Sequence, residues 1–190
     1  CAVVCHPHPL FGGTMDNKVV TTLARALQQC EIPTVRFNFR GVGASAGTFD
    51  DGLGETLDLA VVADWVSRRW PERALVAAGF SFGAYVAMRL SATRALGRLI
   101  TVAPPVTRFD FSGFTGPPCP WLVVQGDADE VVDPVAVAAW AKSRKTQPHL
   151  VMLPGVGHFF HGHLSELRDT VLREIRSGRE ASTAPAAKKA

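Results

Sequence analysis

A serine between two glycines, placed where a strand gives way to a helix, constrains the fold of this chain most. Gly79-Phe-Ser-Phe-Gly83 ends the apolar stretch 74–80 and leads into the apolar stretch 84–90. Side chains at the glycine positions would collide with the neighbouring strand and helix, and the strained turn lifts the serine hydroxyl clear of the sheet. The pattern predicts a buried strand, a sharp turn and a helix, with Ser81 as a candidate nucleophile.

Strands and helices alternate along the rest of the chain. The predicted strands span residues 1–6, 34–39, 74–80, 98–103, 121–125 and 149–153, and the predicted helices span 16–29, 51–69, 84–90, 134–145 and a segment after 160. Apolar strands separated by helices predict a parallel sheet with helices on both faces. We therefore expect an α/β fold, a three-layer αβα sandwich with a mostly parallel sheet, forming one domain over residues 1–176. The tail 177–190, rich in Ala, Ser, Pro and Lys, is predicted to be disordered.

Two of the predicted helices carry apolar residues at helical spacing. In the helix 16–29 the stripe consists of Val19, Val20, Leu23, Ala24 and Leu27. In the helix 51–69 it consists of Leu57, Val61 and Trp65, at positions i, i+4 and i+8.

Composition excludes several classes of function. The net charge of +3 comes without a concentrated Lys/Arg face, which argues against nucleic-acid binding, and no apolar run is long enough to cross a membrane. The cysteines Cys1, Cys5, Cys30 and Cys119 are scattered, which favours reduced thiols and a cytoplasmic location. Because the chain starts at Cys1, almost inside a strand, we expect that N-terminal strands are missing, in the form of an antiparallel hairpin at a sheet edge.

Polar side chains follow the predicted strands at their carboxyl ends. In parallel sheets these ends line one edge, where ligands bind. The polar residues at this edge are His6, His8, Arg40, Ser45, Ser81, Asp127, Asp129, Asp133 and His158. Among them a Ser, an Asp and a His follow separate strands in that chain order, unlike the order in chymotrypsin-like and subtilisin-like proteases.

From His6 to Leu172 the chain resembles the small, single-domain serine hydrolases of the α/β-hydrolase superfamily, in the dienelactone-hydrolase-like branch. The segments that carry the resemblance are His6-Pro-His-Pro-Leu-Phe-Gly-Gly13, Phe37-Asn-Phe-Arg-Gly-Val-Gly43, Gly79-Phe-Ser-Phe-Gly83, Gly126-Asp-Ala-Asp129 and Gly157-His158. The resemblance implies that the first two strands lie in reversed order. This order would bring the loop 6–13 beside Ser81.

The resemblance also implies roles for three residues. Ser81 would be the nucleophile, His158 the base that activates it, and Asp129 the acid that orients the imidazole. Asp127 and Asp133 are alternatives for the acid, but in the family the acid stands three residues after the glycine of G-x-x-D, which selects Asp129. The other candidate bases are His161 and His163, at or inside the last helix.

Backbone N–H groups would hold the oxyanion, and aromatic residues would line the pocket. We expect the N–H groups of Phe82 and Leu10 to be the donors, because Pro9 has none, with Phe11 as the alternative to Leu10. The candidate pocket residues are Phe11, Phe109, Phe111, Phe114 and Phe159.

The expected activity is hydrolysis of small carboxylic esters at an open site. The connection 104–118 is too short for the helical cap that many superfamily members have. A thioesterase, an amidase or an aminopeptidase would use the same residues, and a non-catalytic binding protein is a further alternative. Many dienelactone hydrolases have a Cys nucleophile where this chain has Ser81, which argues against that activity. The expected partner is a small-molecule ester.

No cofactor and no metal is expected. His6 and His8 form a His-x-His pair, which is a weak zinc signal and fits loop anchors that shape the oxyanion loop. The glycines at 41, 43 and 47 have the wrong spacing and position for a dinucleotide-binding loop. Arg40 either braces this loop by hydrogen bonds or contacts an anionic substrate.

Overall fold

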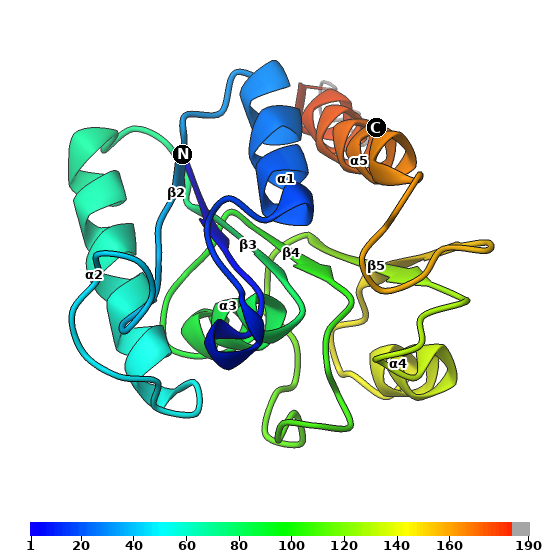
Figure 1. Cartoon of the computed structure of the whole chain (residues 1–190). Coiled ribbons are helices and arrows are strands. Elements are labelled where there is room, and N and C mark those ends of the chain that lie inside the picture. The colour runs from blue at the N-terminus through cyan, green and yellow to red at the C-terminus, as the bar shows by residue number, and fades with distance from the viewer. Residues whose placement is uncertain (184–190) are drawn as a thin grey trace.

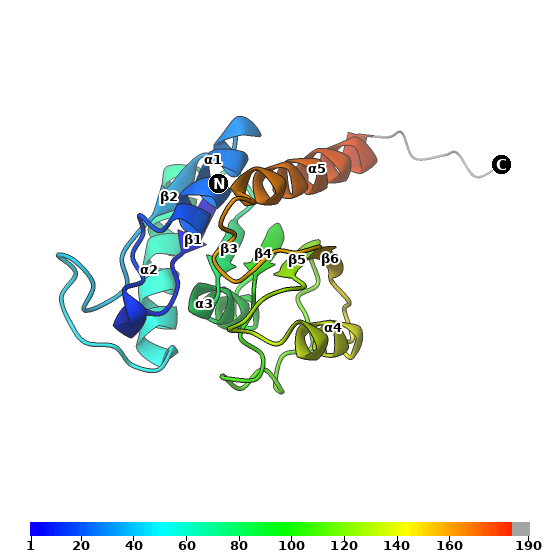
Figure 2. The ribbon, with the colours of Figure 1, turned by 45° about the vertical axis from the view of Figure 1, so that its right-hand side comes forward.

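The structure, a computed structural model, describes residues 1–183 and consists of a sheet between two layers of helices (Figures 1 and 2). The described strands form one six-stranded sheet in the order β2-β1-β3-β4-β5-β6, and every pair is parallel. Their bounds are β1 (Ala2–Cys5), β2 (Thr34–Arg36), β3 (Val76–Phe80), β4 (Arg98–Val102), β5 (Trp121–Gly126) and β6 (His149–Leu153). The reversed order of the first two strands, implied by the resemblance, is confirmed.

Helices cover both faces of the sheet, as expected for a three-layer sandwich. Helices α1 (Lys18–Gln29) and α5 (Leu164–Thr183) pack on one face, where one core cluster lies. Helices α2 (Leu53–Arg69), α3 (Phe82–Ser91) and α4 (Pro134–Lys142) pack on the other, around a second core cluster. A short 3₁₀ helix, η1 (Pro9–Phe11), interrupts the loop after β1. None of the described helices is long and apolar enough to cross a membrane.

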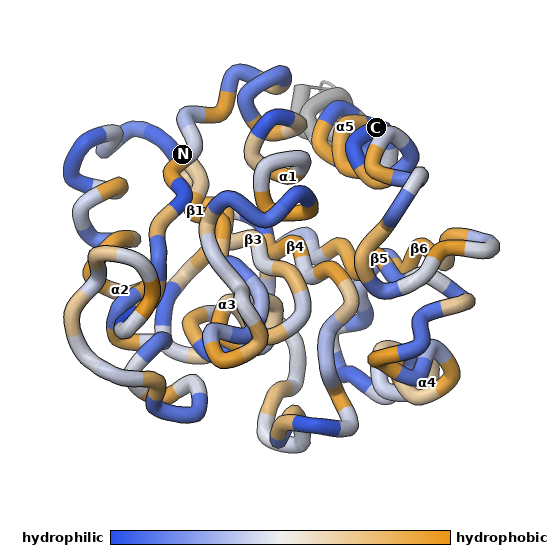
Figure 3. The backbone as a smooth tube through the Cα atoms, viewed as in Figure 1, coloured by the Kyte–Doolittle hydropathy of each residue, from blue (hydrophilic) through white to orange (hydrophobic). Residues whose placement is uncertain are grey.

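The apolar stripe predicted on α1 is buried, whereas the one predicted on α2 is exposed. All five stripe residues of α1 are buried. On α2, Leu57, Val61 and Trp65 are 64%, 68% and 52% exposed, and the face that packs inward carries Leu59, Ala63 and Val66. Apolar and polar residues alternate along α2 (Figure 3), so spacing alone did not identify its buried face. The small Ala63 on this face allows close packing, which the larger Trp65 would prevent.

The end of the chain also differs from the prediction. Helix α5 continues to Thr183, so the prediction of disorder from residue 177 is wrong over 177–183. The rest of the predicted tail, 184–190, lies outside the described residues. The connection between β4 and β5 contains no helix, in agreement with the expected absence of a cap domain.

Candidate active site

Ser81 lies at a strained turn between β3 and α3. Its backbone has φ 53° and ψ −119°, an unusual conformation for a residue with a side chain. A Cβ at Gly79 would lie 2.1 Å from the carbonyl oxygen of Gly83, and a Cβ at Gly83 would lie 2.5 Å from that of Cys5. The two glycines are therefore required by close backbone contacts, and the predicted strand, turn and helix are present.

His158 connects Ser81 to Asp129 by two hydrogen bonds. The Nε2 atom of His158 lies 3.2 Å from the Ser81 Oγ, and its Nδ1 atom lies 2.8 Å from the Asp129 Oδ2. Both His158 and Asp129 are buried. An ionised carboxylate only accepts hydrogen bonds, so the proton of the neutral ring sits on Nδ1 and Nε2 is free to accept the serine proton.

Asp129 is held by more donors than His158 alone. Its Oδ1 accepts the N–H groups of Val131 and Val132, at 2.8 and 2.7 Å, and its Oδ2 accepts Nε2 of Gln125 at 2.9 Å. Burial raises the pKa of Asp129, but the hydrogen bonds from His158, Val132 and Val131 together outweigh burial and hold this pKa below its usual value. Asp129 is therefore a buried carboxylate that stays ionised.

Gln125 was missed by sequence reasoning. It is the polar residue of the otherwise apolar strand β5, and its side chain is buried. It donates to Asp129 and to the carbonyl oxygen of Gly126, whereas its own Oε1 has no partner among the described residues. The signal was present in the sequence, because a buried amide at the end of an apolar strand requires a polar neighbour.

The competing acids and bases have other partners. Asp127 accepts the N–H of Gly155 at 2.6 Å, and Asp133 caps α4 by accepting the N–H of Val135. His163, directly before α5, pairs with Glu166 in the first turn of that helix. The exposed His161 stacks on Phe159. None of these four residues is hydrogen-bonded to Ser81 or to His158 within the described residues.

His6 is a buried anchor for the loop that follows β1. Its Nδ1 lies 2.7 Å from the carbonyl oxygen of Pro7, and its Nε2 accepts the N–H of Phe39 at 3.0 Å. Burial lowers the pKa of His6 to about 4, and the hydrogen bond to Pro7 opposes this shift only in part. Both ring nitrogens are thus engaged with backbone. Residues 1–183 contain no group of three or more His, Cys, Asp or Glu side chains placed to hold a metal.

The structure does not bring Leu10 to Ser81. The N–H of Leu10 donates to Nδ1 of His8 at 3.2 Å, and its exposed side chain lines neither of the cavities beside Ser81. This expectation was wrong because the loop closes into η1, which turns that N–H toward His8. The N–H of Phe11 donates to the carbonyl oxygen of His8. Within residues 1–183, the N–H groups of Phe82 and His8 have no acceptor.

Two cavities of about 330 Å³ each adjoin Ser81. Both are lined by Ser81 together with His8, Phe11, Arg108 and Val131. Of the other predicted pocket residues, Phe109 lines one cavity and Phe159 the other.

Phe111 and Phe114 do not line either cavity beside Ser81. Phe111 is buried between Tyr85 and Trp140, and Phe114 faces a separate cavity beside Met88. Their assignment to the pocket was wrong because the connection between β4 and β5 folds back onto α3 and α4, which carries these two rings away from Ser81.

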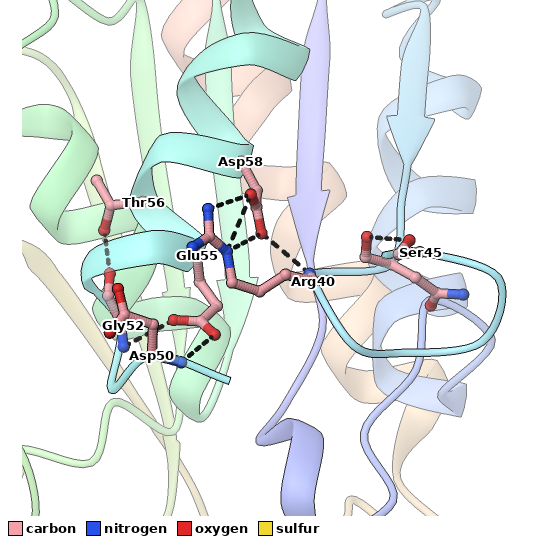
Figure 4. A network of polar contacts seen from close by, with 8 residues as sticks. Arg40, Ser45, Asp50, Gly52, Glu55, Thr56 and Asp58 are labelled. Atoms are coloured by element: carbon pink, nitrogen blue, oxygen red, sulfur yellow. Dashed lines mark hydrogen bonds and ion pairs between the residues drawn. The ribbon is translucent and has the colours of Figure 1, made fainter. Parts of the chain in front are cut away.

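The glycine-rich loop after β2 is held by a polar network (Figure 4). Arg40 forms a two-pronged ion pair with Asp58 of α2, and Glu55 accepts the N–H groups of Asp50 and Gly52. Arg40 is therefore a brace, one of the two roles that the sequence left open. The braced loop holds Phe49 against the rings of His8 and Phe82.

Comparison with known proteins identifies relatives over nearly the whole chain, although no family model matches it. An α/β serine hydrolase without a lid from Xanthomonas campestris is 52% identical, with a TM-score of 0.90 over 93% of this chain and 81% of that chain. An α/β serine hydrolase homologue from Coxiella burnetii is 48% identical, with a TM-score of 0.89 over 92% of this chain and 84% of that chain.

A more distant relative extends this match. An uncharacterized protein from Rickettsia prowazekii is 34% identical over 180 residues, which cover 90% of this chain and 76% of the relative. The connection without a helix between β4 and β5 agrees with the relative from Xanthomonas campestris, which is a serine hydrolase without a lid. On this basis the chain belongs to the α/β serine hydrolase superfamily, among the members without a lid.

Proposed function

We propose that this chain hydrolyses small carboxylic esters through an acyl-enzyme on Ser81. The observation that carries the proposal is the continuous hydrogen-bond path from Ser81 through His158 to the buried Asp129, at the edge of two open cavities. This is the arrangement that activates a serine hydroxyl, which is a weak nucleophile without a base.

In the first step, Nε2 of His158 takes the proton of Ser81 while Oγ attacks the ester carbonyl carbon. Asp129 stabilises the imidazolium that forms and keeps the ring oriented. The carbonyl oxygen becomes an oxyanion, and the free N–H groups of Phe82 and His8 are the donors that we assign to it. Phe82 begins α3, so the helix N-terminus also favours negative charge here.

In the second step, the tetrahedral intermediate collapses and the bond between the acyl carbon and the alcohol oxygen breaks. His158 gives its proton to that oxygen, and the acyl group remains on Ser81. Water then enters, His158 takes one of its protons, and the hydroxide oxygen attacks the acyl carbon. The tetrahedral intermediate breaks the bond to Oγ, which recovers its proton from His158. The products are a carboxylic acid and an alcohol, and no cofactor takes part.

The size and openness of the site support short or medium acyl chains. Each cavity is about 330 Å³, and Phe11 at the rim is 83% exposed. Without a cap, long chains would find little apolar surface to cover them. We also place the enzyme in the cytoplasm, which the reduced thiols of Cys1, Cys5 and Cys119 support.

A fluorophosphonate probe and a 4-nitrophenyl ester test the proposal together. Wild-type protein should be labelled and should release nitrophenolate, whereas Ser81→Ala should show no labelling and a kcat lower by about 10⁴-fold or more. Ser165→Ala, at an exposed serine of α5, is the matched control and should retain both. A wild-type protein that is not labelled, or a Ser81→Ala variant that is labelled equally, would refute the proposal.

A further inference from the structure

Arg108 lies at the rim of the site and lines both cavities beside Ser81. It comes from the connection between β4 and β5, and the residue is exposed to solvent. Its Nη2 donates to the carbonyl oxygen of Val131 at 3.2 Å, which fixes one edge of the guanidinium. A guanidinium has five N–H donors, so this contact leaves others available at the cavity mouth.

Arg108 lacks the carboxylate partner that other arginines of this protein have. Arg40 pairs with Asp58, and Arg98 pairs with Glu174. In residues 1–183, no carboxylate lies within ion-pair distance of Arg108. An unpaired guanidinium beside a cavity is a ready site for an anion.

The lining of the two cavities favours an anion. Among the described residues, neither cavity is lined by Asp or Glu, and Arg108 is the one Lys or Arg side chain that lines them. Burial lowers the pKa of His8, although Asp51 and Glu55 oppose this shift, so the His8 ring is neutral at neutral pH. The fixed positive charge of the site therefore comes from Arg108 and from the N-terminus of α3.

We infer that Arg108 binds a carboxylate carried by the substrate, so that the enzyme prefers hemiesters of short dicarboxylic acids to neutral esters of the same size. The inference rests on the proposed esterase function and specifies its substrate class. The carboxylate would accept the free N–H donors of Arg108 while the ester carbonyl lies at Ser81. Because the guanidinium is exposed, its contribution is a preference and not an absolute requirement.

The test compares two esters that differ only in charge. Monomethyl glutarate carries a carboxylate, and methyl glutaramate carries a neutral amide of the same shape. We expect wild type to have the higher kcat/KM on the hemiester. Arg108→Gln should lower the ratio of kcat/KM for the hemiester to kcat/KM for the amide about tenfold, mainly because KM for the hemiester rises. Arg108→Lys should recover part of the ratio, and added salt should reduce it in wild type.

The control variant is Arg168→Gln, at an arginine of α5 that pairs with Asp169 and lines neither cavity beside Ser81. It should leave the ratio unchanged. An equal loss on both esters in Arg108→Gln would show that the bond to Val131 merely shapes the wall, and an unchanged ratio would show that no carboxylate is bound. Either result overturns the inference.

A binding measurement separates this inference from the proposed function. Calorimetry with glutarate and the Ser81→Ala variant needs no turnover. We expect glutarate to bind to Ser81→Ala. The double variant, which also carries Arg108→Gln, should bind glutarate about tenfold more weakly. Equal glutarate binding with and without Arg108 would overturn the anion site even if esters are hydrolysed. If wild type hydrolyses no ester while glutarate still binds through Arg108, the esterase proposal alone would be refuted.

Discussion

The two sides of Ser81 differ in how firmly their side chains are held. On the inner side, His158, Asp129 and His6 are buried, and each ring nitrogen and each carboxylate oxygen has a hydrogen-bond partner. On the outer side, Phe11 is 83% exposed and Arg108 has a single bond to backbone.

This difference separates the proposed chemistry from recognition. Proton transfer needs groups held within a few tenths of an ångström, and a saturated network supplies that precision. Recognition at an open mouth needs only charge and apolar surface, so its residues are free to move and to be exchanged. Variants on the inner side should therefore have larger effects than variants on the outer side.

Asp129→Asn should produce the largest effect among the variants that test this comparison. The amide keeps the shape of the carboxylate but cannot stabilise an imidazolium, and its NH₂ favours the wrong tautomer of His158. We expect kcat to fall by roughly 10²- to 10⁴-fold in ester hydrolysis assays. Asp127→Asn and Asp133→Asn should each change kcat by less than about threefold, because both side chains bind only backbone N–H groups.

The order of these three variants decides which residue is the acid. A larger fall for Asp127→Asn or Asp133→Asn would reassign the role. Circular dichroism and thermal unfolding of each variant would exclude loss of the fold as the cause.

Protonation of His6 should produce an intermediate effect, on stability. In the unfolded chain an imidazole titrates near 6.5, whereas the pKa of His6 in the folded protein is about 4. Above pH 6.5 the ring is neutral in both states and contributes no pH dependence. As the pH falls from 6.5 to 4, the unfolded chain binds the proton first, so the free energy of unfolding decreases by about 3 kcal/mol from this residue.

Urea unfolding at several pH values would measure this loss. The stability advantage of wild type over His6→Gln should shrink by about 3 kcal/mol between pH 7 and pH 4. The same comparison with His161→Gln, at an exposed histidine, should show no such change. A constant difference between wild type and His6→Gln would contradict the buried, neutral state of this ring.

Phe11→Ala should have the smallest effect. Since the ring is mostly in solvent, its loss should change stability by less than about 0.5 kcal/mol and should raise KM for a short ester by roughly threefold. Leu10→Ala is the matched control, because Leu10 is also exposed but lines neither cavity beside Ser81, and it should leave KM unchanged. A large fall in kcat for Phe11→Ala would show that the outer side also positions the reacting groups.

Helices α1 and α2 show how far sequence patterns predicted this fold. The order of strands and helices was predictable, because apolar strands and helical spacing recur along the chain. The buried face of α1 was also predictable, since Val20, Leu23 and Leu27 lie on its one apolar face. On α2 the packing against α3 and β1 decides between two apolar faces, and Leu57 lies on the exposed one.

The site divides in the same way. Ser81, Asp129 and His158 were predictable because each follows a strand whose end is fixed by the sheet, and the structure brings them together. Leu10 and Phe111 were misplaced because they lie in irregular connections, whose path depends on local turns and on tertiary packing. Sequence patterns do not encode such paths as periodic signals.

The positive φ of Ser81 limits which nucleophiles this protein can acquire in evolution. A Thr would add a branched Cβ at φ 53°, a conformation that β-branched residues strongly disfavour. A Cys has the same unbranched Cβ as Ser, so the backbone accepts it without further strain. The turn therefore allows Ser81 to be replaced by Cys as the nucleophile, but disfavours its replacement by Thr.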